Sequence, residues 1–280
     1  MRDIRSHFSG VAAQYRSLRT TDRAPVERIA ELLPGIELIR AADVGCGAGR
    51  YDLELFRELE PRLDLYCTDS DANMLRELRQ YLSGHGFRTF HPVLAHARNL
   101  PLRADSLDAV VTFNAVHHFR VRAFLREAVR VLRPGGMLFV YTRLRSQNRN
   151  NIWGMHFPSF WRKETRLFER EEFQALVESV PGLTLESVEF FRYERVSSLD
   201  ELLEKARRRH YSTFCLYSPK ELAAAFTRFE DNLRRHYRDL AQITWHDENV
   251  MFIARRAQAA RRVWRGAASR AGMSPGDRLR

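Results

Sequence analysis

The stretch that decides the fold is AADVGCGAGR, at residues 41–50. An apolar strand is predicted to end at Val44, and a glycine-rich turn then leads into a helix that begins near Arg50. Glycine tolerates positive φ and lets the main chain approach a ligand closely. The free N–H groups at the start of a helix favour an anion. The segment therefore predicts a ligand site at the first strand–helix junction.

The spacing of the glycines distinguishes between cofactor classes. A dinucleotide-binding turn reads G-x-G-x-x-G, and its third glycine would fall at Arg50 here. The sequence instead reads D-x-G-x-G-x-G from Asp43 to Gly49. This spacing weakens the prediction of a nicotinamide or flavin site, and a dehydrogenase of the dinucleotide-binding type stays as an alternative.

An acid follows the second predicted strand at the place where a ribose is bound. The strand at 63–68 ends at Asp69, which lies 20 residues beyond Gly49. A carboxylate about 20 residues after the glycine turn accepts hydrogen bonds from ribose hydroxyls. Asp69 also precedes a helix, as Ser70 and Asp71 do. We assign the N-cap to Ser70 or Asp71 and the ribose contact to Asp69.

Apolar runs alternate with helical stretches along most of the chain. Helices alternating with buried strands predict right-handed crossovers and a parallel sheet covered on both faces. Thr21-Asp22 before Pro25 predict a capped helix over 25–33. The strands are expected near 38–44, 63–68, 89–94, 107–113, 137–142, 183–193 and 242–254, and the helices at 50–60, 71–82, 120–132 and 169–180.

Composition bounds the class of protein. The chain has 280 residues, 44% of them hydrophobic and 29% charged, which fits one large globular domain or two small ones. Its 3 cysteines form no CxxC pair, so we expect no disulfide framework and no metal site. No secretory signal and no run long enough to span a membrane is present. We expect a soluble protein of the cytoplasm.

The net charge of +11 is concentrated at the C-terminus. Residues 255–280 hold eight Arg and one Asp, which leaves only +4 for the preceding 254 residues. We interpret this segment as a basic tail, solvated or disordered. Its alternative interpretations are a short membrane-surface helix and a non-specific phosphate contact.

Four motifs together resemble class I S-adenosylmethionine (SAM)-dependent methyltransferases, and most closely the ubiquinone- and menaquinone-biosynthesis (methyltransferase type 11) subgroup. The resemblance covers roughly residues 10–142. It is carried by DVGCGAGR (43–50), CTDSDANML (67–75), ARNLPLRADSLDAVVTFNAVHHF (97–119) and RVLRPGGMLFV (130–140). It implies an α/β fold with a Rossmann-like, mostly parallel seven-stranded sheet, helices on both faces and an antiparallel last strand.

The resemblance also implies the residues that bind SAM. Asp43 would orient the turn, Asp69 would hold the ribose, and Asn114 would lie under the methionine moiety. The other cofactor-binding residues implied are Gly45, Cys46, Gly47, Gly49, Ser70, Met74, Ala97 and Arg98. The family commonly has an acid just before Ala97, where this chain has His96. A neutral imidazole accepts the hydrogen bond from adenine and a protonated one does not.

The reaction requires alignment of a nucleophile with the methyl carbon and exclusion of water. A general base is needed only for a protonated nucleophile, and His117 and His118 are the candidates, with packing as the alternative role. Residues 143–168 and the charged block 199–240 are expected to form an acceptor cap. The candidate acceptor contacts are Tyr15, Arg19, Trp153, Phe157, Phe160, Trp161, His210 and Tyr211.

The sequence therefore predicts one methyltransferase domain over residues 1–254, acting as a monomer or homodimer. It would transfer a methyl group to an O, N or C nucleophile of a small molecule, with S-adenosylhomocysteine as the second product. The alternatives are an RNA-modifying methyltransferase and a SAM-binding protein without turnover. No Pro-Pro-aromatic signature follows Asn114, so we expect no specific nucleic-acid partner.

Overall fold

A computed structural model describes residues 19–258. Within this range seven strands form one sheet in the order β3-β2-β1-β4-β5-β7-β6. Strands β1 to β5 pair in parallel, and β7 pairs antiparallel with both β5 and β6. The strands are β1 Ile39–Val44, β2 Leu63–Asp69, β3 Phe90–Leu94, β4 Leu107–Phe113, β5 Leu132–Thr142, β6 Leu183–Ser197 and β7 Ile243–Arg256. The predicted seven-stranded α/β fold with an antiparallel last strand is confirmed.

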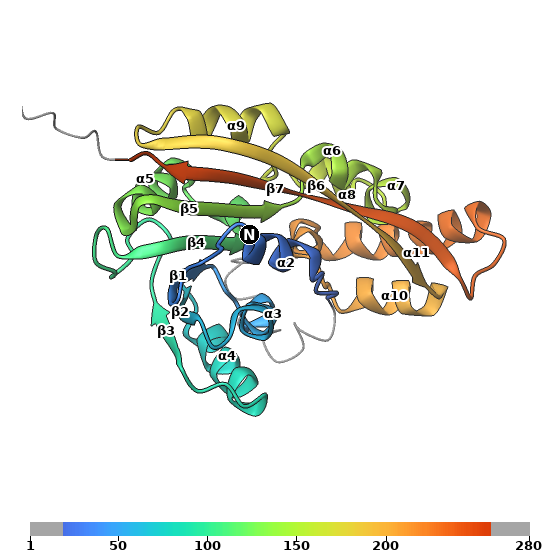
Figure 1. Ribbon diagram of the computed structural model, residues 1–280. Coiled ribbons are helices and arrows are strands. Elements are labelled where there is room, and N and C mark those ends of the chain that lie inside the picture. Colours follow the sequence, from blue (N-terminus) through green and yellow to red (C-terminus); the bar gives the residue numbers. More distant parts are fainter. Residues whose placement is uncertain (1–18, 259–280) are drawn as a thin grey trace, which may run out of the picture.

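Helices cover both faces of the sheet because each buries one apolar stripe. On one face, α2 (Ala24–Glu31), α3 (Arg50–Leu59) and α4 (Ala72–Gly84) share a core with β1 and β2. On the other, α5 (Val121–Val131) and α9 (Arg170–Glu178) pack against β4, β5 and β7. Figure 1 shows the sheet together with these two sets of helices.

The strand order reverses between β1 and β4, which lie side by side at the centre of the sheet. Chains leave these two strands toward opposite faces, so a crevice opens beyond their carboxyl ends. The glycine turn follows β1, and the loop from Asn114 follows β4. The topology therefore places both segments at the position where open α/β sheets bind ligands.

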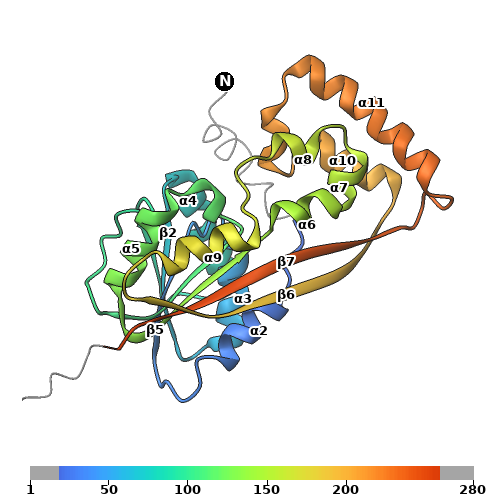
Figure 2. The same cartoon turned by 90° about the horizontal axis from the view of Figure 1, so that it is seen from above.

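The last two strands are longer than the sequence predicted. The strand expected at 183–193 continues to Ser197, and the strand expected at 242–254 continues to Arg256. The added residues of β6, 194–197, pair with residues 246–243 of β7, and Arg255 and Arg256 pair with Thr184 and Leu183. As Figures 1 and 2 show, β6 and β7 thus extend beyond the other strands as a two-stranded arm that carries helices at its far end.

Those helices form the cap, which we define as the helical segments within residues 145–163 and 199–236. It contains α6 (Arg145–Asn150), α7 (Ile152–His156), α8 (Phe160–Lys163), α10 (Leu199–Arg207), the 3-10 helix η2 (Ser212–Leu216) and α11 (Pro219–His236). Its two parts are far apart in sequence but share one hydrophobic core. Phe214 and Phe229 from the second part are fully buried against Trp153 and Phe157 from the first.

Helix starts agree with the sequence at one place and differ at another. Asp71 caps α4, and its carboxylate accepts from the Asn73 N–H at 2.8 Å, as predicted. The predicted cap of α2 is wrong, because Arg23 occupies the N-cap without a side-chain bond. Asp22 instead pairs with Arg195 of β6 at 2.6 Å. A long-range ion pair has replaced the local cap.

The structure describes only the first residues of the predicted basic tail, and it bears on the membrane prediction only within the described range. Arg255 and Arg256, which we assigned to the tail, are strand residues of β7. Residues 259–280 lie outside the described part of the chain. Among residues 19–258, no helix combines the length and the apolar character needed to cross a membrane.

Candidate active site

The glycine turn between β1 and α3 has three left-handed residues in alternation. Gly45, Gly47 and Gly49 have φ values of +77°, +58° and +85°, a conformation that residues with a Cβ avoid. A Cβ on Gly45 would lie 2.7 Å from the Ala115 Cβ, whereas a Cβ on Gly47 would meet nothing within 4 Å. Gly45 thus permits close packing of two loops, and Gly47 presents bare main chain to an open cavity.

Asp69, the last residue of β2, fixes that turn. Its Oδ2 accepts from the Gly47 N–H at 2.9 Å, and its Oδ1 accepts from the Asp71 N–H at 2.9 Å. Burial raises the pKa of Asp69, and these backbone hydrogen bonds oppose the rise. One carboxylate therefore joins the glycine turn to the start of α4 while its side chain lines the cavity.

Asp43, at the end of β1, lies beneath the turn and is almost fully buried. Its Oδ1 has no hydrogen-bond partner among the described residues. Burial, followed by the charges of Asp52 and Asp69, raises the pKa of Asp43 well above its usual range. An orphaned buried carboxyl oxygen beside a cavity fits a ligand that brings a donor or a positive charge.

The remaining residues that the resemblance assigned to the cofactor also line this cavity. Met74 forms a buried apolar contact surface, and Asn114 has a positive φ of 53° with its N–H bonded to the Tyr141 carbonyl at 2.7 Å. The others at the cavity wall are Asp43, Gly45, Cys46, Gly47, Asp69, Ser70, Ala97 and Arg98, with His96 beside them. Gly49 does not line the cavity, because its left-handed backbone forms the start of α3.

His117 and His118 form a short 3-10 helix, η1 (Val116–His118), just after β4. Their ring centroids are 4.1 Å apart and both line the cavity. Burial, together with the charges of His118, Arg166 and Arg19, lowers the pKa of His117 well below its usual range. The pKa of His118 falls to about 4, chiefly through burial. Both rings are therefore neutral near pH 7 and weak as bases.

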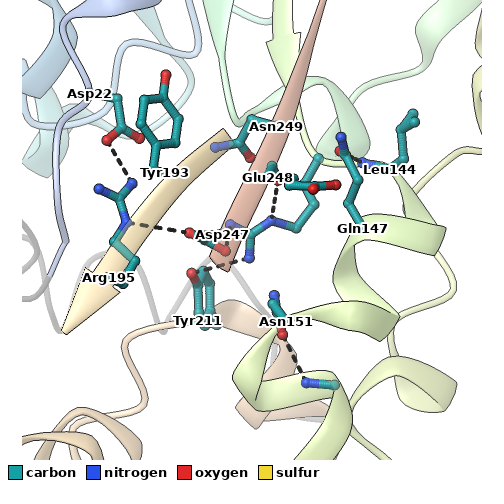
Figure 3. A network of polar contacts seen from close by, with 12 residues as sticks. Asp22, Leu144, Gln147, Asn151, Tyr193, Arg195, Tyr211, Asp247, Glu248 and Asn249 are labelled. Carbon is teal, nitrogen blue, oxygen red and sulfur yellow. Dashed lines mark hydrogen bonds and ion pairs between the residues drawn. The ribbon is translucent and has the colours of Figure 1, made fainter. Parts of the chain in front are cut away.

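The cavity has a volume of about 700 Å³ and continues from the glycine turn to the inner surface of the cap. This volume is within the range of ligand sites. Its cap side is lined by polar side chains from several segments, and Figure 3 shows Asp22 before α2, Arg195 of β6, Asp247 of β7 and Tyr211 before η2 close to one another. Arg143 binds Asp247 at 2.5 Å and the Tyr211 hydroxyl at 3.3 Å, while Arg195 binds Asp22 at 2.6 Å.

The structure divides the predicted acceptor contacts into two groups. Arg19, Trp153, His210 and Tyr211 line the cavity, and the Arg19 guanidinium lies 4.4 Å from the Tyr211 ring centroid. Tyr15 lies outside the described residues.

The other aromatic predictions do not reach the cavity. Phe157 and Phe160 are buried in the hydrophobic core of the cap, where they pack on Phe214. Trp161 lies between the guanidinium groups of Arg149 and Arg162. None of these three rings lines the cavity, because Phe157 and Phe160 pack the two parts of the cap together and Trp161 contacts neighbouring arginines.

Sequence reasoning missed a group of charged residues at the cap side of the cavity. The group comprises Asp22, Arg143, Glu164, Arg166, Arg195, Lys205 and Asp247. Arginine is so frequent in this chain that no single one stands out. A signal was available in the predicted final strands, where the antiparallel register aligns Tyr193 with Asp247 and brings Arg195 beside the same segment.

Comparison with known proteins agrees with this geometry. Residues 42–140 match the family described as a methyltransferase domain. The chain is 27% identical over 186 residues to the tRNA (carboxymethyluridine(34)-5-O)-methyltransferase ALKBH8 of Macaca fascicularis, which covers 63% of this chain and 26% of that protein. It is 38% identical over 127 residues to the phthiotriol/phenolphthiotriol dimycocerosates methyltransferase of Mycobacterium leprae, covering 43% of each.

Among solved structures, the YcgJ protein of Bacillus subtilis has a TM-score of 0.61 at 17% identity and covers 85% of this chain and 100% of its own. That likeness concerns the fold. The match to the methyltransferase domain covers about a third of the chain, and the matched residues 42–140 contain the glycine turn and the loop after β4. The chain spans 26% and 43% of the lengths of the two curated relatives named above, whose acceptors differ from each other.

Proposed function

We propose that this chain binds SAM at the glycine turn and transfers its methyl group to an acceptor held under the cap. The observation that carries the proposal is the hydrogen bond from the Gly47 N–H to Asp69, which holds an open, left-handed main chain against the cavity. A dinucleotide site would use a third glycine where Arg50 lies. A calorimetric titration with SAM, and with NAD as the control ligand, tests this choice.

The residues present fit SAM in chemistry as well as in position. Asp69 would accept from the ribose hydroxyls, and the orphaned Oδ1 of Asp43 would face the amino group directly or through water. Ser70, Met74, Ala97 and Arg98 would surround the adenine, and Asn114 would lie under the methionine moiety. When bound, SAM supplies a methyl carbon that its sulfonium has already made electrophilic.

The chain's own residues then have three tasks. The glycine turn and Asp69 orient the donor, because they are tied to two neighbouring strands. The cap excludes water from one side of the cavity, because Trp153 belongs both to the hydrophobic core of the cap and to the cavity wall. The polar groups from the arm position the acceptor. Holding donor and acceptor in line is the main catalytic contribution in such a reaction.

We favour a small-molecule acceptor over RNA. The reacting end of the cavity lies beneath the cap, and several basic residues on the outer surface of the cap are paired with acids on the same helices. Arg207 and Arg208 pair with Glu204, and Arg234 pairs with Glu230. Such pairing leaves less free positive charge for phosphates.

RNA nevertheless stays as the second candidate, because one relative is named for a tRNA acceptor and another for a dimycocerosate. Incubation with methyl-labelled SAM and either a small-molecule extract or total tRNA separates the two. Label in the small-molecule fraction supports our proposal, whereas label only in tRNA selects the alternative. SAM binding with label in neither fraction would indicate a binding protein without turnover.

The domain organisation belongs to the same proposal. Residues 1–254 would act as one methyltransferase domain, in which the segments 143–168 and 199–240 form the acceptor cap. The shared hydrophobic core of these two segments supports the assignment. A cytoplasmic monomer or homodimer is our expectation, and light scattering during size-exclusion chromatography measures the oligomeric state.

A further inference from the structure

The cap side of the cavity carries more positive than negative charge. Four cationic side chains line it against three acidic ones, an excess of one positive charge. The cations are Arg143, Arg166, Arg195 and Lys205, and the acids are Asp22, Glu164 and Asp247. SAM itself carries a net positive charge, so a neutral or cationic acceptor would leave this excess uncompensated in a partly desolvated space.

Each of the three acids is already held by the protein. Arg195 binds Asp22 at 2.6 Å, and Arg143 binds Asp247 at 2.5 Å. Glu164 is paired with Arg166 and also accepts from the Thr213 hydroxyl at 2.7 Å. These carboxylates therefore neutralise partners in the wall, and none is left as the base for an acceptor proton.

Two cations keep bonding capacity that the wall does not use. Lys205 donates to the Ser197 hydroxyl at 3.3 Å and has no ion pair with a carboxylate in the part of the chain that the structure describes. The Nη1 atom of Arg166 is buried without a hydrogen-bond partner among residues 19–258. An ammonium and a guanidinium with free donors are the groups that bind carboxylate or phosphate.

Aromatic rings lie beside these cations. The backbone carbonyl of Lys205 accepts from the backbone N–H of His210 and lies 2.9 Å from its Nδ1. The His210 ring is 4.6 Å from Trp153 and 4.1 Å from Tyr211. The site therefore combines a surface for an apolar or planar body with donors for an anionic group.

Within the residues that the structure describes, the cavity wall offers no strong base to remove a proton from an acceptor. His117 and His118 line the cavity just after β4, and burial with neighbouring arginines depresses their pKa values. A weak base contributes little to ionising a hydroxyl or an ammonium nucleophile. A nucleophile that is already ionised needs no such help.

We propose that the acceptor is a small organic acid whose ionised carboxylate is bound by Lys205 and Arg166, and that a carboxylate oxygen receives the methyl group. The new bond joins this oxygen to the methyl carbon, while the carbon–sulfur bond breaks and its electron pair goes to sulfur. No proton moves. The products are a methyl ester and neutral S-adenosylhomocysteine. The inference deepens the proposed function and rests on it.

The first experiment identifies the methylated atom. The full chain is incubated with methyl-labelled SAM and a small-molecule extract, and the labelled products are treated with dilute alkali. A methyl ester releases the label as volatile methanol, whereas ethers and N- or C-methyl groups keep it. Volatile label supports the proposal. Alkali-stable label would overturn it and leave the methyltransferase assignment intact.

The second experiment measures binding without turnover. The chain is saturated with S-adenosylhomocysteine and titrated with benzoate, phenylacetate and indole-3-acetate, each beside its primary amide. We expect the acids to bind more tightly than the amides. Amides that bind as tightly, or the failure of all three acids to bind, would overturn the proposal. Failure of S-adenosylhomocysteine itself to bind would instead count against the proposed function.

The variants Lys205→Met and Lys205→Arg locate the anion site. Loss of a charged hydrogen bond predicts at least about a tenfold weaker affinity for the acid in Lys205→Met, with partial recovery in Lys205→Arg. Affinity for S-adenosylhomocysteine should stay unchanged. Lys163→Met is the matched control, because Lys163 lies on the cap but pairs with Glu221 away from the cavity. Equal acid affinity in Lys205→Met and wild type would contradict the site.

Discussion

Single residues at the glycine turn show how a few atoms define a cofactor site. Asp69 uses both carboxylate oxygens on backbone N–H groups, one from each neighbouring loop. The carboxylate therefore shapes the turn through contacts within the protein alone. Gly45 and Gly47 share a left-handed backbone but serve different purposes, since one packs against Ala115 and the other faces open space.

The variant Asp69→Asn should bind SAM roughly tenfold more weakly, because an amide offers one acceptor oxygen where two charged ones are used. Calorimetry with SAM and with S-adenosylhomocysteine measures the change. Asp64→Asn is the control, since Asp64 lies on the same strand but pairs with His91 outside the cavity. Wild-type affinity in Asp69→Asn would remove the ribose assignment.

The variant Gly47→Val should lose at least about tenfold in SAM affinity, because its side chain would fill space that the ligand needs. Gly86→Val is a close control. Gly86 also has a positive φ and open space around a Cβ, but it follows α4 outside the cavity. Both variants pay a similar backbone cost of about 1–2 kcal/mol. Equal SAM affinity in the two would show that ligand does not approach Gly47.

At the scale of elements, the arm formed by β6 and β7 explains how the cap is held. The two strands pair from Leu183↔Arg256 to Ser197↔Ile243 with one register shift between Leu185 and Ser187, and α10 begins two residues after β6 ends. The first part of the cap lies between β5 and α9 in the chain, and the second part lies between β6 and β7. Four chain connections and one shared core therefore fix its position over the cavity.

The variant Phe229→Ala should destabilise the cap by about 3–5 kcal/mol. Phe229 of α11 is fully buried and its ring stacks on Trp153 with centroids 5.1 Å apart. We expect the KM for the acceptor to rise while SAM affinity changes little, because the residues proposed to bind SAM lie at the ends of the sheet strands and in the segments that follow them, outside the core of the cap. Phe226→Ala, on a partly exposed face of the same helix, should show a smaller effect. A parallel loss of SAM affinity would contradict an independent cap.

At the scale of the whole molecule, the stability of the fold depends on a buried carboxyl group on one face of the sheet. The core that contains α3 also encloses Asp52, a fully buried carboxyl behind the glycine turn. Burial raises the pKa of Asp52 to about 7, opposed mainly by the Cys67 thiol. An unfolded aspartate titrates near 3.8. Between about pH 4 and pH 7, the folded protein therefore keeps a proton on Asp52 that the unfolded chain has already released.

It follows that Asp52 contributes a loss of stability as pH rises through this window, since the unfolded state binds fewer protons. Asp52→Asn cannot ionise and should not show this loss. Its unfolding midpoint relative to wild type should therefore increase from pH 5 to pH 8. Chemical denaturation at both values measures the difference, with the exposed Asp200→Asn as control. Parallel pH profiles of wild type and Asp52→Asn would contradict the prediction.

Comparing the unfolding midpoints of Asp52→Asn and wild type at the same pH also separates the effect of Asp52 from the effect of the histidines. The lowered pKa values of His117, His118 and His156 act in the opposite sense, because a folded state that resists protonation loses stability as pH falls below about 6.5. These groups are present in wild type and in both variants. Their contribution therefore cancels in the difference between unfolding midpoints.

Much of the sheet was predictable, and the reason is local. Buried parallel strands such as Leu107–Phe113 are continuously apolar, so their positions were read within a residue or two. The ends were harder. Strand β5 begins at Leu132, earlier than the predicted 137, because pairing with Leu107 extends it through Pro134 and the glycines. Pairing partners decide where a strand stops, and they lie elsewhere in the chain.

The amino-acid sequence alone determined the order of strands and helices, the left-handed glycine turn and the acid at the end of β2, because each depends on neighbours within one crossover. Only the tertiary structure decided which aromatic rings form the core of the cap and which charged groups face the cavity. Arg143 and Asp247 are separated by 104 residues, and Asp22 and Arg195 by 173. Such contacts exist only after the sheet has brought its edges and the cap together.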